Sequence, residues 1–373
     1  MSLTVAHIGP SKLPILYPMG GATERRIREI ATRQATRGDK VIIYSAEAQT
    51  RTSEYNGAEI RALRCMTSGV LRCGEFMVKA VRDMKSLRPD VIHFHSHAEG
   101  AALARGIDAV KVLSYDFYMF RRGKQNPFHP WYRKALNRFS RLLPVSDYCL
   151  RESASYWSLP ADRMRVVYNG VSLQQFYPDP AAGAAYRKAI GIEPDEFVAL
   201  YVGRVCYQKG TDLLIEACRQ LREEGRKLRL VVAGPVGQFG SEGGGELTKR
   251  LQETGGIYLG PVEESQLRAV YNLCDVFVMP TLAYEMFGMA AIEAQACGKA
   301  VICSNNGGLP EVIPADSGML FQMGEVAGLT ANLRSLMDSR KLHQRLTSAA
   351  VPNARRFAWE TIATDLEEVY SAR

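Results

Sequence analysis

Short runs of apolar, often β-branched residues alternate along the chain with longer stretches in which apolar residues recur at helical spacing. In the first half, such runs lie at 5–8, 41–44, 91–94 and 110–113, with amphipathic stretches near 22–37 and 75–87. The pattern begins again after residue 195, with runs at 198–202, 228–233, 256–259, 276–279 and 301–303 and an amphipathic stretch near 211–224. Strands that alternate with helices in this way predict doubly wound parallel sheets. We therefore expect two Rossmann-like α/β domains facing across a cleft.

The boundary between the two series lies near Tyr168 and Asn169, ahead of a proline-bearing stretch at 177–180. We predict a first domain over 1–168 and a second over 169–354. The last segment, 355–373, has the apolar spacing of a helix and is treated as a separate terminal helix. A length of 373 residues agrees with two domains of ordinary size.

The composition is that of a globular protein, with 46% apolar and 23% charged residues. No apolar run approaches the roughly 20 residues that span a bilayer. The first residues read directly as a strand, without the basic region of a signal peptide. The eight cysteines are scattered and form no C-x-x-C pair. This pattern favours free thiols over disulfides or a zinc site, and we expect a cytoplasmic protein.

The net charge of +8 is unevenly distributed. Residues 1–168 carry 27 Lys and Arg against 15 Asp and Glu, a balance of +12, whereas residues 169–373 carry 20 against 24, a balance of −4. The basic first domain fits an anionic acceptor or peripheral contact with phospholipids of the inner membrane surface, and it fits a merely solvated basic face equally well. No nucleic-acid recognition motif accompanies the charge, so we expect no nucleic-acid partner.

A basic amphipathic segment at 131–143 belongs to this first domain. We expect it to form a domain helix with Trp131, Ala135, Phe139 and Leu142 packed inward. The alternative is a helix that rests on anionic lipid.

Two carboxylates, Glu285 and Glu293, follow the apolar run at 276–279 and lie eight residues apart. Eight residues are about two helical turns plus 80°, so the two would not stack on one helix face. We therefore expect Glu285 in the loop between strand and helix and Glu293 one turn into the helix, both at the carboxyl end of a parallel strand, where such sheets bind ligands. The N–H groups at the helix start suit a phosphate. Acceptors for hydroxyl groups beside donors for phosphate fit a nucleotide-sugar.

Arg204 and Lys209 follow the run at 198–202, in a predicted loop. Transfer from a nucleotide-sugar requires the charge of the leaving diphosphate to be neutralised. Many transferases use a metal held by a D-x-D motif, which this chain lacks. Two fixed cations can do the same work, Arg as a planar fork and Lys as a point charge. We expect no cofactor and no metal.

Three motifs in this order resemble those of a known family. They are V-G-R-V-C-Y-Q-K-G at 202–210, E-M-F-G-M-A-A-I-E-A-Q-A-C-G at 285–298 and N-G-G-L-P-E at 306–311. The chain resembles glycosyltransferase family 4, the retaining transferases with the GT-B fold. The resemblance extends over nearly the whole chain and is stronger in the second half.

The resemblance implies roles for individual residues. Arg204 and Lys209 would bind the diphosphate, and Glu285 would accept hydrogen bonds from the donor sugar. The donor-binding residues would be Gly20 and Gly21 of a glycine loop, Val262 at the base, Met286, Phe287 and Gly288 through backbone amides, and Glu293 at the ribose. His95, Tyr115 and Asp116 would lie on the acceptor side. The base would be uracil, common in the family, and the terminal helix would cross back onto the first domain.

Alternating histidines at 93, 95 and 97 would all lie on one strand face, and we expect no Cys or carboxylate beside them and no zinc. Tyr115 stands where the family usually has a histidine. A phenol has a reference pKa near 10, so it is a poor base at neutral pH. A proton-transfer role at this position is therefore in doubt.

Together with this resemblance, the residues predict a retaining, metal-independent transfer of a hexose or N-acetylhexosamine to a hydroxyl acceptor. The acceptor remains open between a lipid-linked glycan, a polyol phosphate and a secondary metabolite. One alternative is a nucleotide-sugar epimerase, but no convincing acid–base carboxylate pair stands near the sugar position. The other is a non-catalytic nucleotide-sugar-binding or membrane-associated protein, which would have no need of the complete set of charged residues.

Overall fold

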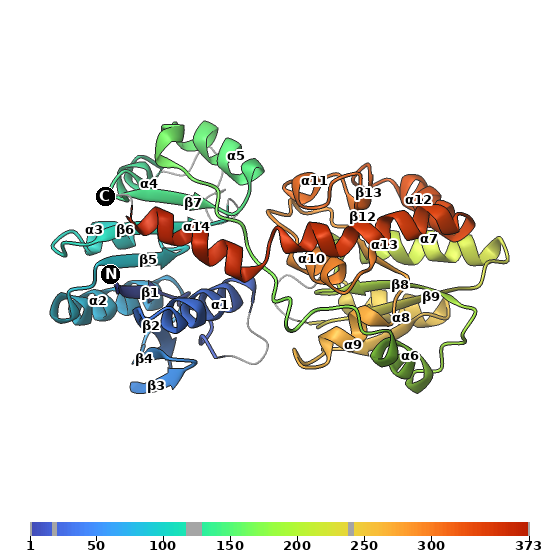
Figure 1. Cartoon of the computed structure of the whole chain (residues 1–373), viewed down its shortest axis with the longest axis horizontal. Coiled ribbons are helices and arrows are strands. Elements are labelled where there is room, and N and C mark those ends of the chain that lie inside the picture. Colours follow the sequence, from blue (N-terminus) through green and yellow to red (C-terminus); the bar gives the residue numbers. More distant parts are fainter. Residues whose placement is uncertain (1, 17–20, 117–128, 238–241, 372–373) are drawn as a thin grey trace. The chain divides into compact units, whose positions relative to one another are not determined.

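The computed structural model describes residues 2–16, 21–116, 129–237 and 242–371, which form two compact units (Figure 1). Unit 1 comprises Met1–Gly170 and Trp359–Arg373, and unit 2 comprises Val171–Ala358. The boundaries predicted from the sequence were after residues 168 and 354.

Unit 1 is built on a seven-stranded sheet with the strand order β3-β4-β2-β1-β5-β6-β7. All neighbouring strands are parallel except β3 and β4, which form an antiparallel hairpin. The strands are β1 (Thr4–Ile8), β2 (Lys40–Glu47), β3 (Arg51–Tyr55), β4 (Ala58–Arg64), β5 (Val91–His95), β6 (Val110–Tyr115) and β7 (Arg141–Pro144). The strand order reverses direction between β1 and β5, which is the topological switch point of this sheet.

The helices of unit 1 bury apolar stripes at helical spacing. They are α1 (Ala22–Thr36), α2 (Gly69–Leu87), α3 (Gly100–Leu103), α4 (His129–Leu136), α5 (Asp147–Trp157), the 3₁₀ turn Ala161–Arg163 and α14 (Trp359–Ser371). α14 buries Trp359, Ile362 and Leu366, residues three and four positions apart that share one face. It packs on α1, where Arg33 bonds Glu360. The chain's last helix therefore completes the first unit.

The basic segment at 131–143 differs from the prediction of one helix. α4 ends at Leu136, and 141–144 form the edge strand β7 on β6, with Val112 opposite Arg141. Phe139 and Leu142 are buried as predicted, but Trp131 is 48% exposed. Periodicity misled here because a short apolar run suits either a helix or a strand.

Unit 2 has a six-stranded parallel sheet with the order β10-β9-β8-β11-β12-β13. Its strands are β8 (Phe197–Val202), β9 (Leu228–Ala233), β10 (Ile257–Gly260), β11 (Val276–Met279), β12 (Ala300–Ser304) and β13 (Gly318–Phe321). Its helices are α6 (Pro180–Ala189), the 3₁₀ turn η3 (Tyr207–Lys209), α7 (Thr211–Glu223), α8 (Gly244–Glu253), α9 (Leu267–Asn272), α10 (Met289–Ala296), α11 (Leu309–Val312), α12 (Val326–Asp338) and α13 (Arg340–Arg355). The switch point of this sheet lies between β8 and β11.

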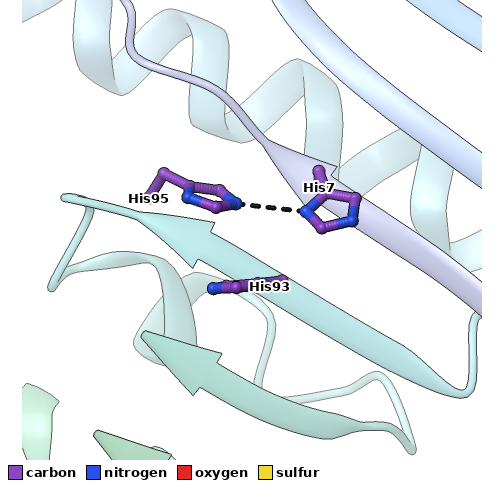
Figure 2. Close-up of side chains that lie close together, drawn as sticks. All are labelled: His7, His93 and His95. Atoms are coloured by element: carbon purple, nitrogen blue, oxygen red, sulfur yellow. Dashed lines mark hydrogen bonds between the residues drawn. The ribbon is translucent and has the colours of Figure 1, made fainter. Parts of the chain in front are cut away.

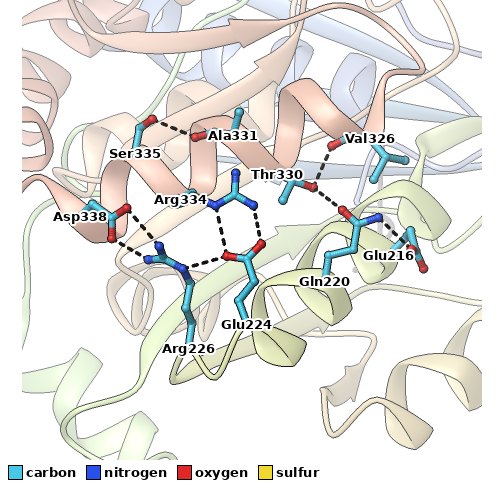
Figure 3. A network of polar contacts seen from close by, with 10 residues as sticks. All are labelled: Glu216, Gln220, Glu224, Arg226, Val326, Thr330, Ala331, Arg334, Ser335 and Asp338. Atoms are coloured by element: carbon cyan, nitrogen blue, oxygen red, sulfur yellow. Dashed lines mark hydrogen bonds and ion pairs between the residues drawn. The ribbon is translucent and has the colours of Figure 1, made fainter.

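α7 and α12 lie side by side over the unit 2 core, and polar contacts join their exposed edges (Figure 3). Arg226 Nη1 bonds Asp338 Oδ1 at 2.6 Å, and Thr330 Oγ1 donates to Gln220 Oε1 at 3.1 Å. The Arg226–Asp338 pair is exposed, so it contributes little to stability. The apolar cluster beneath, which includes Leu214, Leu221 and Leu333, holds the helices to the sheet.

Among the helices that the structure describes, none has the length and apolar content that crossing a bilayer requires.

Candidate active site

The predicted diphosphate and sugar residues of unit 2 converge at its switch point. Lys209 follows β8 through η3, and Glu285 lies between the end of β11 at Met279 and the start of α10 at Met289. β8 and β11 are hydrogen-bonded neighbours, so their carboxyl ends meet at one place. The ammonium Nζ of Lys209 lies 2.7 Å from Glu285 Oε2. Their side chains are 25% and 22% exposed, so this ion pair remains accessible to a ligand.

The loops that carry this pair are fixed by backbone hydrogen bonds. The carbonyl of Gln208 accepts from the N–H groups of Leu282 and Ala283, each at 3.0 Å. Asn306 after β12 donates through Nδ2 to the carbonyl of Ala283 at 2.7 Å. Three loops at the carboxyl edge thereby hold one another, which preorganises the charged groups between them.

Glycines of the first and third motifs allow the close approach of these loops. Gly307 has φ +60°, and a Cβ at this position would lie 2.1 Å from the carbonyl oxygen of Glu285. The N–H of the next residue, Gly308, donates to that same oxygen at 2.8 Å. Gly210 has φ +68°, and a Cβ there would lie 1.9 Å from the carbonyl oxygen of Pro280. Both glycines are required because a side chain would push Glu285 or Lys209 out of place.

Arg204 lies two residues beyond the end of β8 and is partly exposed. The hydroxyl of the buried Tyr201 donates to the Arg204 carbonyl at 2.8 Å, which fixes the backbone there. Arg204 and Lys209 therefore follow the same strand, in the short segment that leads into α7.

Glu293 is the fifth residue of α10, as the spacing argument predicted. It is only 4% exposed, and the hydroxyl of Tyr271 on α9 donates to its Oε2 at 2.7 Å. Tyr271, which orients this carboxylate, was not among the predicted site residues. The carboxylate of Glu293, which is predicted to bind the ribose, is therefore oriented by a hydrogen bond from the buried phenol of Tyr271.

The segment before α10 offers its backbone, since the side chains of Met286 and Phe287 are buried and Phe287 packs edge-on against Phe357. Gly288 caps α10 with φ +92°. The first N–H groups of a helix have no intrahelical partner and carry its positive dipole end. Val262, beyond the edge strand β10, is partly exposed.

Of the predicted donor-binding glycines of unit 1, Gly20 lies outside the described residues, and Gly21 directly precedes α1. On the acceptor side, the structure describes all three predicted residues. Tyr115 ends β6 and is 3% exposed, and burial raises the pKa of its phenol further above the usual value. This strengthens the expectation that it does not act as a base. Asp116 follows and is partly exposed.

His95 belongs to a buried cluster in the middle of the unit 1 sheet, with His7 of β1 and His93 of β5 (Figure 2). The His93 and His95 rings stack with centroids 4.1 Å apart, and His95 Nε2 lies 3.1 Å from His7 Nδ1. His7 Nε2 bonds Gln34 Oε1 at 2.7 Å. Burial lowers the pKa of all three rings, that of His7 to about 4, so they are neutral at pH 7. At 1% exposure, His95 offers no surface to an acceptor, contrary to the predicted acceptor-side position.

The prediction for His97 was wrong on two points. β5 ends at His95 and Ser96 has φ +67°, so the strand alternation breaks and His97 leaves the face shared by His93 and His95. His97 Nδ1 lies 3.0 Å from Glu99 Oε1 and 3.4 Å from Cys73 Sγ, so a carboxylate and a thiol do stand beside it. Burial lowers the pKa of His97, but hydrogen bonds with Cys73 and Glu99 outweigh burial and raise it to about 10.

Family models match both halves of the chain. One described as "Glycosyltransferase Family 4" matches residues 19–175, and one described as "Glycosyl transferases group 1" matches residues 184–351. The chain belongs to the family 4 glycosyltransferases. The resemblance read from the three motifs is confirmed.

The chain is also similar to named glycosyltransferases. D-inositol 3-phosphate glycosyltransferases of Streptomyces scabiei and Catenulispora acidiphila are each 34% identical to the chain, over 230 and 242 residues. These alignments cover 59% and 62% of this chain and 51% and 56% of the two relatives. The chain thus spans about half the length of the curated relatives it matches.

Solved structures show the fold. Sucrose-phosphate synthase from Thermosynechococcus elongatus and HepE of Anabaena, the latter in complex with UDP and glucose, both give a TM-score of 0.81 at 20% identity. The first comparison covers 99% of this chain and 98% of the synthase, and the second covers 100% of both chains. The predicted class of two Rossmann-like α/β domains of GT-B type is confirmed.

Proposed function

We propose that this protein is a retaining glycosyltransferase that moves a hexose or N-acetylhexosamine from a nucleoside-diphosphate sugar to a hydroxyl acceptor without a metal. The observation that carries the proposal is the Lys209–Glu285 pair, 2.7 Å apart and accessible at the switch point of unit 2. Family membership makes transfer, rather than epimerisation or mere binding, the reaction that this site serves.

The donor would be held by groups of both signs. Arg204, Lys209 and the N-terminus of α10 supply positive charge for the diphosphate. Glu285 would accept hydrogen bonds from the sugar hydroxyls, and Glu293, oriented by Tyr271, would accept from the ribose. The base would lie against the backbone near Val262.

Lys209 has three N–H groups, of which Glu285 engages one. The remaining two can reach a phosphate without breaking the pair. As the glycosidic bond breaks, negative charge grows on the leaving diphosphate, and a fixed ammonium and guanidinium stabilise that charge without reorganisation. Glu285 holds the ammonium in position and contacts the sugar at the same time.

Proton transfer in this scheme needs no protein base. The leaving phosphate would take the proton of the acceptor hydroxyl on the same face of the sugar, which retains the configuration at the anomeric carbon. The buried phenol of Tyr115, with its raised pKa, could not take that proton near neutral pH.

Uridine diphosphate is the nucleotide we favour. The solved structure of Anabaena HepE contains UDP, and another of the same protein contains UDP-glucose. The relatives named for D-inositol 3-phosphate favour a polyol phosphate among the three acceptor classes, and the basic balance of the first 168 residues suits its phosphate. We place the reaction in the cytoplasm, with any peripheral membrane contact made by unit 1.

The test is incubation with a panel of α-linked UDP-sugars and the three acceptor classes, followed by NMR of the product. The proposal expects release of UDP only with a competent acceptor, and an α-configured product. A β-configured product would refute retention, and conversion of the donor sugar to an epimer without acceptor would establish the epimerase instead.

A further inference from the structure

Three side chains with metal-binding atoms converge beside the end of β1 in unit 1. Cys73 Sγ lies 3.4 Å from His97 Nδ1 and 3.1 Å from Glu99 Oε1, and His97 Nδ1 lies 3.0 Å from Glu99 Oε1. Cys73 comes from α2, and the other two come from the connection between β5 and α3. This is one of two groups of possible ligands among the described residues.

The second nitrogen of His97 fixes which nitrogen faces this group. Nε2 lies 3.0 Å from the carbonyl oxygen of Gly9, an atom that can only accept, so Nε2 carries hydrogen. Nδ1 is thus the nitrogen available to a metal. An imidazole that donates to a backbone carbonyl through its other nitrogen is the usual arrangement of a metal-binding histidine. His97 is also 5% exposed, so its ring is held in this orientation.

The same geometry argues against a nucleophile–base relay. In such a relay the imidazole presents one nitrogen to the nucleophile and the other to the orienting carboxylate. Here thiol and carboxylate both face Nδ1. The sulfur, nitrogen and oxygen atoms therefore surround one point, as metal ligands do, and do not form a thiol–imidazole–carboxylate chain.

The spacing fits a small borderline cation. With zinc–sulfur distances near 2.3 Å and zinc–nitrogen or zinc–oxygen distances near 2.0–2.1 Å, tetrahedral ligand atoms lie roughly 3.3–3.6 Å apart. The three separations of 3.0, 3.1 and 3.4 Å need only a few tenths of an ångström of expansion. Thiolate, imidazole and carboxylate together favour zinc over magnesium or calcium, which prefer oxygen ligands.

The other group, His7, His93 and His95, is a poorer candidate for a metal site (Figure 2). Both ring nitrogens of His7 and both of His93 are already hydrogen-bonded, the latter to Tyr370 and Ser114. All three rings are at most 1% exposed. A cation there would have to break a buried network, and the group itself has no anionic member.

The Cys73–His97–Glu99 group is not fully enclosed by protein. The Glu99 side chain is 24% exposed and Cys73 is partly exposed. Gly9 follows β1 and His97 follows β5, the two strands at the switch point of the unit 1 sheet. A fourth coordination position would therefore face the edge where such sheets bind ligands.

We propose that Cys73, His97 and Glu99 form a zinc-binding site in unit 1 with three protein ligands and an exchangeable fourth position. The site does not rest on the proposed function, since no residue of unit 2 takes part.

The first experiment uses the full wild-type chain, stripped with a chelator and kept in a phosphine reductant. Zn²⁺ should bind in a one-to-one ratio by calorimetry and raise the melting temperature, whereas Mg²⁺ should do neither. Co²⁺ should give the sulfur-to-metal charge-transfer band and the intense visible bands of a tetrahedral thiolate site. Absence of zinc binding, or a cobalt spectrum without the charge-transfer band, would overturn the proposal.

Alkylation gives a second readout that needs no variant. All eight cysteines lie in described parts of the chain, and Cys73 alone is not buried. Iodoacetamide should label Cys73 first, and Zn²⁺ should slow that labelling at least tenfold. Labelling of Cys73 at the same rate with and without zinc would contradict the site.

Variants assign the ligands. Cys73→Ser and Glu99→Gln preserve size, and each should weaken zinc binding by more than the roughly 10- to 100-fold that loss of an outer hydrogen bond costs. Cys65→Ser is the matched control, because this buried cysteine belongs to neither group. Unchanged affinity in a folded Cys73→Ser chain, or equal loss in Cys65→Ser, would refute the assignment. Circular dichroism melts establish that each variant is folded.

Discussion

The buried histidines of unit 1 should make that unit sensitive to acid. His7 is fully buried, and burial lowers its pKa to about 4, against an unfolded value near 6.5. A folded-state pKa below the unfolded one gives stability that is present above pH 6.5 and lost as the pH falls toward 4. One pKa unit is worth about 1.36 kcal/mol, so His7 alone should remove about 2 kcal/mol from the free energy of unfolding between pH 8 and pH 5.

The structure supplies the assay. The three tryptophans, Trp131, Trp157 and Trp359, all belong to unit 1, so tryptophan fluorescence during urea unfolding reports that unit. The comparison is between the parent and His7→Gln at pH 8 and pH 5. His97, whose pKa is raised, contributes with the opposite sign over this range because its stability is lost as pH rises. That contribution is common to both chains and cancels in the difference.

The expected result is that His7→Gln is less stable than the parent at pH 8 and that this gap narrows by about 2 kcal/mol at pH 5. Parallel stability profiles for the two chains would show that His7 titrates normally, and the burial argument would fail. A gap that widened toward pH 5 would mean that the ring is charged and paired in the folded state.

Further predictions concern the site of unit 2. In transfer assays, Glu285→Gln should lower kcat about 100-fold or more, and in nucleotide titrations its affinity should stay within a few-fold of the parent. Equal turnover in Glu285→Gln and the parent would refute the role of Glu285. Lys209→Ala should lower both kcat and nucleotide affinity. Gly307→Ala should cost about 1–3 kcal/mol of unit 2 stability and most of the activity, whereas Gly225→Ala, with φ +80° in open space, controls for backbone strain alone. Excess chelator should leave transfer intact, and a loss restored by magnesium would contradict a metal-free step.

Most of the buried parallel strands could be predicted because apolar residues dominate each run, but β4 and β13 were not among the predicted strands. β9 and β11 match the predicted ranges residue for residue. β3 was not predicted because its hairpin is exposed and polar, so its residues show no hydrophobic periodicity. β7 was not predicted because its four residues at the sheet edge look like the continuation of the preceding amphipathic helix.

Some features of the candidate site could likewise be predicted from the sequence, and others could not. The placement of Glu285 in a loop and Glu293 in a helix followed from spacing, but the contact between Lys209 and Glu285, 76 residues apart, depends on which strands are neighbours. Tyr271 and Cys73 could not be found from sequence. Cys73 preceded the predicted helix, which in fact begins at Gly69, and its partners come from another part of the chain.

The proposed function requires that the loops around Lys209 and Glu285 hold a nucleotide-sugar. The most direct measurement is thermal stabilisation by a panel of nucleotides and nucleotide-sugars without metal. A ligand at a hundredfold excess over its Kd stabilises the native state by about 2.7 kcal/mol, which a melting scan resolves. We expect a shift with UDP or a UDP-sugar that is lost in Lys209→Ala. If no nucleotide stabilises the chain, these loops do not hold a nucleotide-sugar.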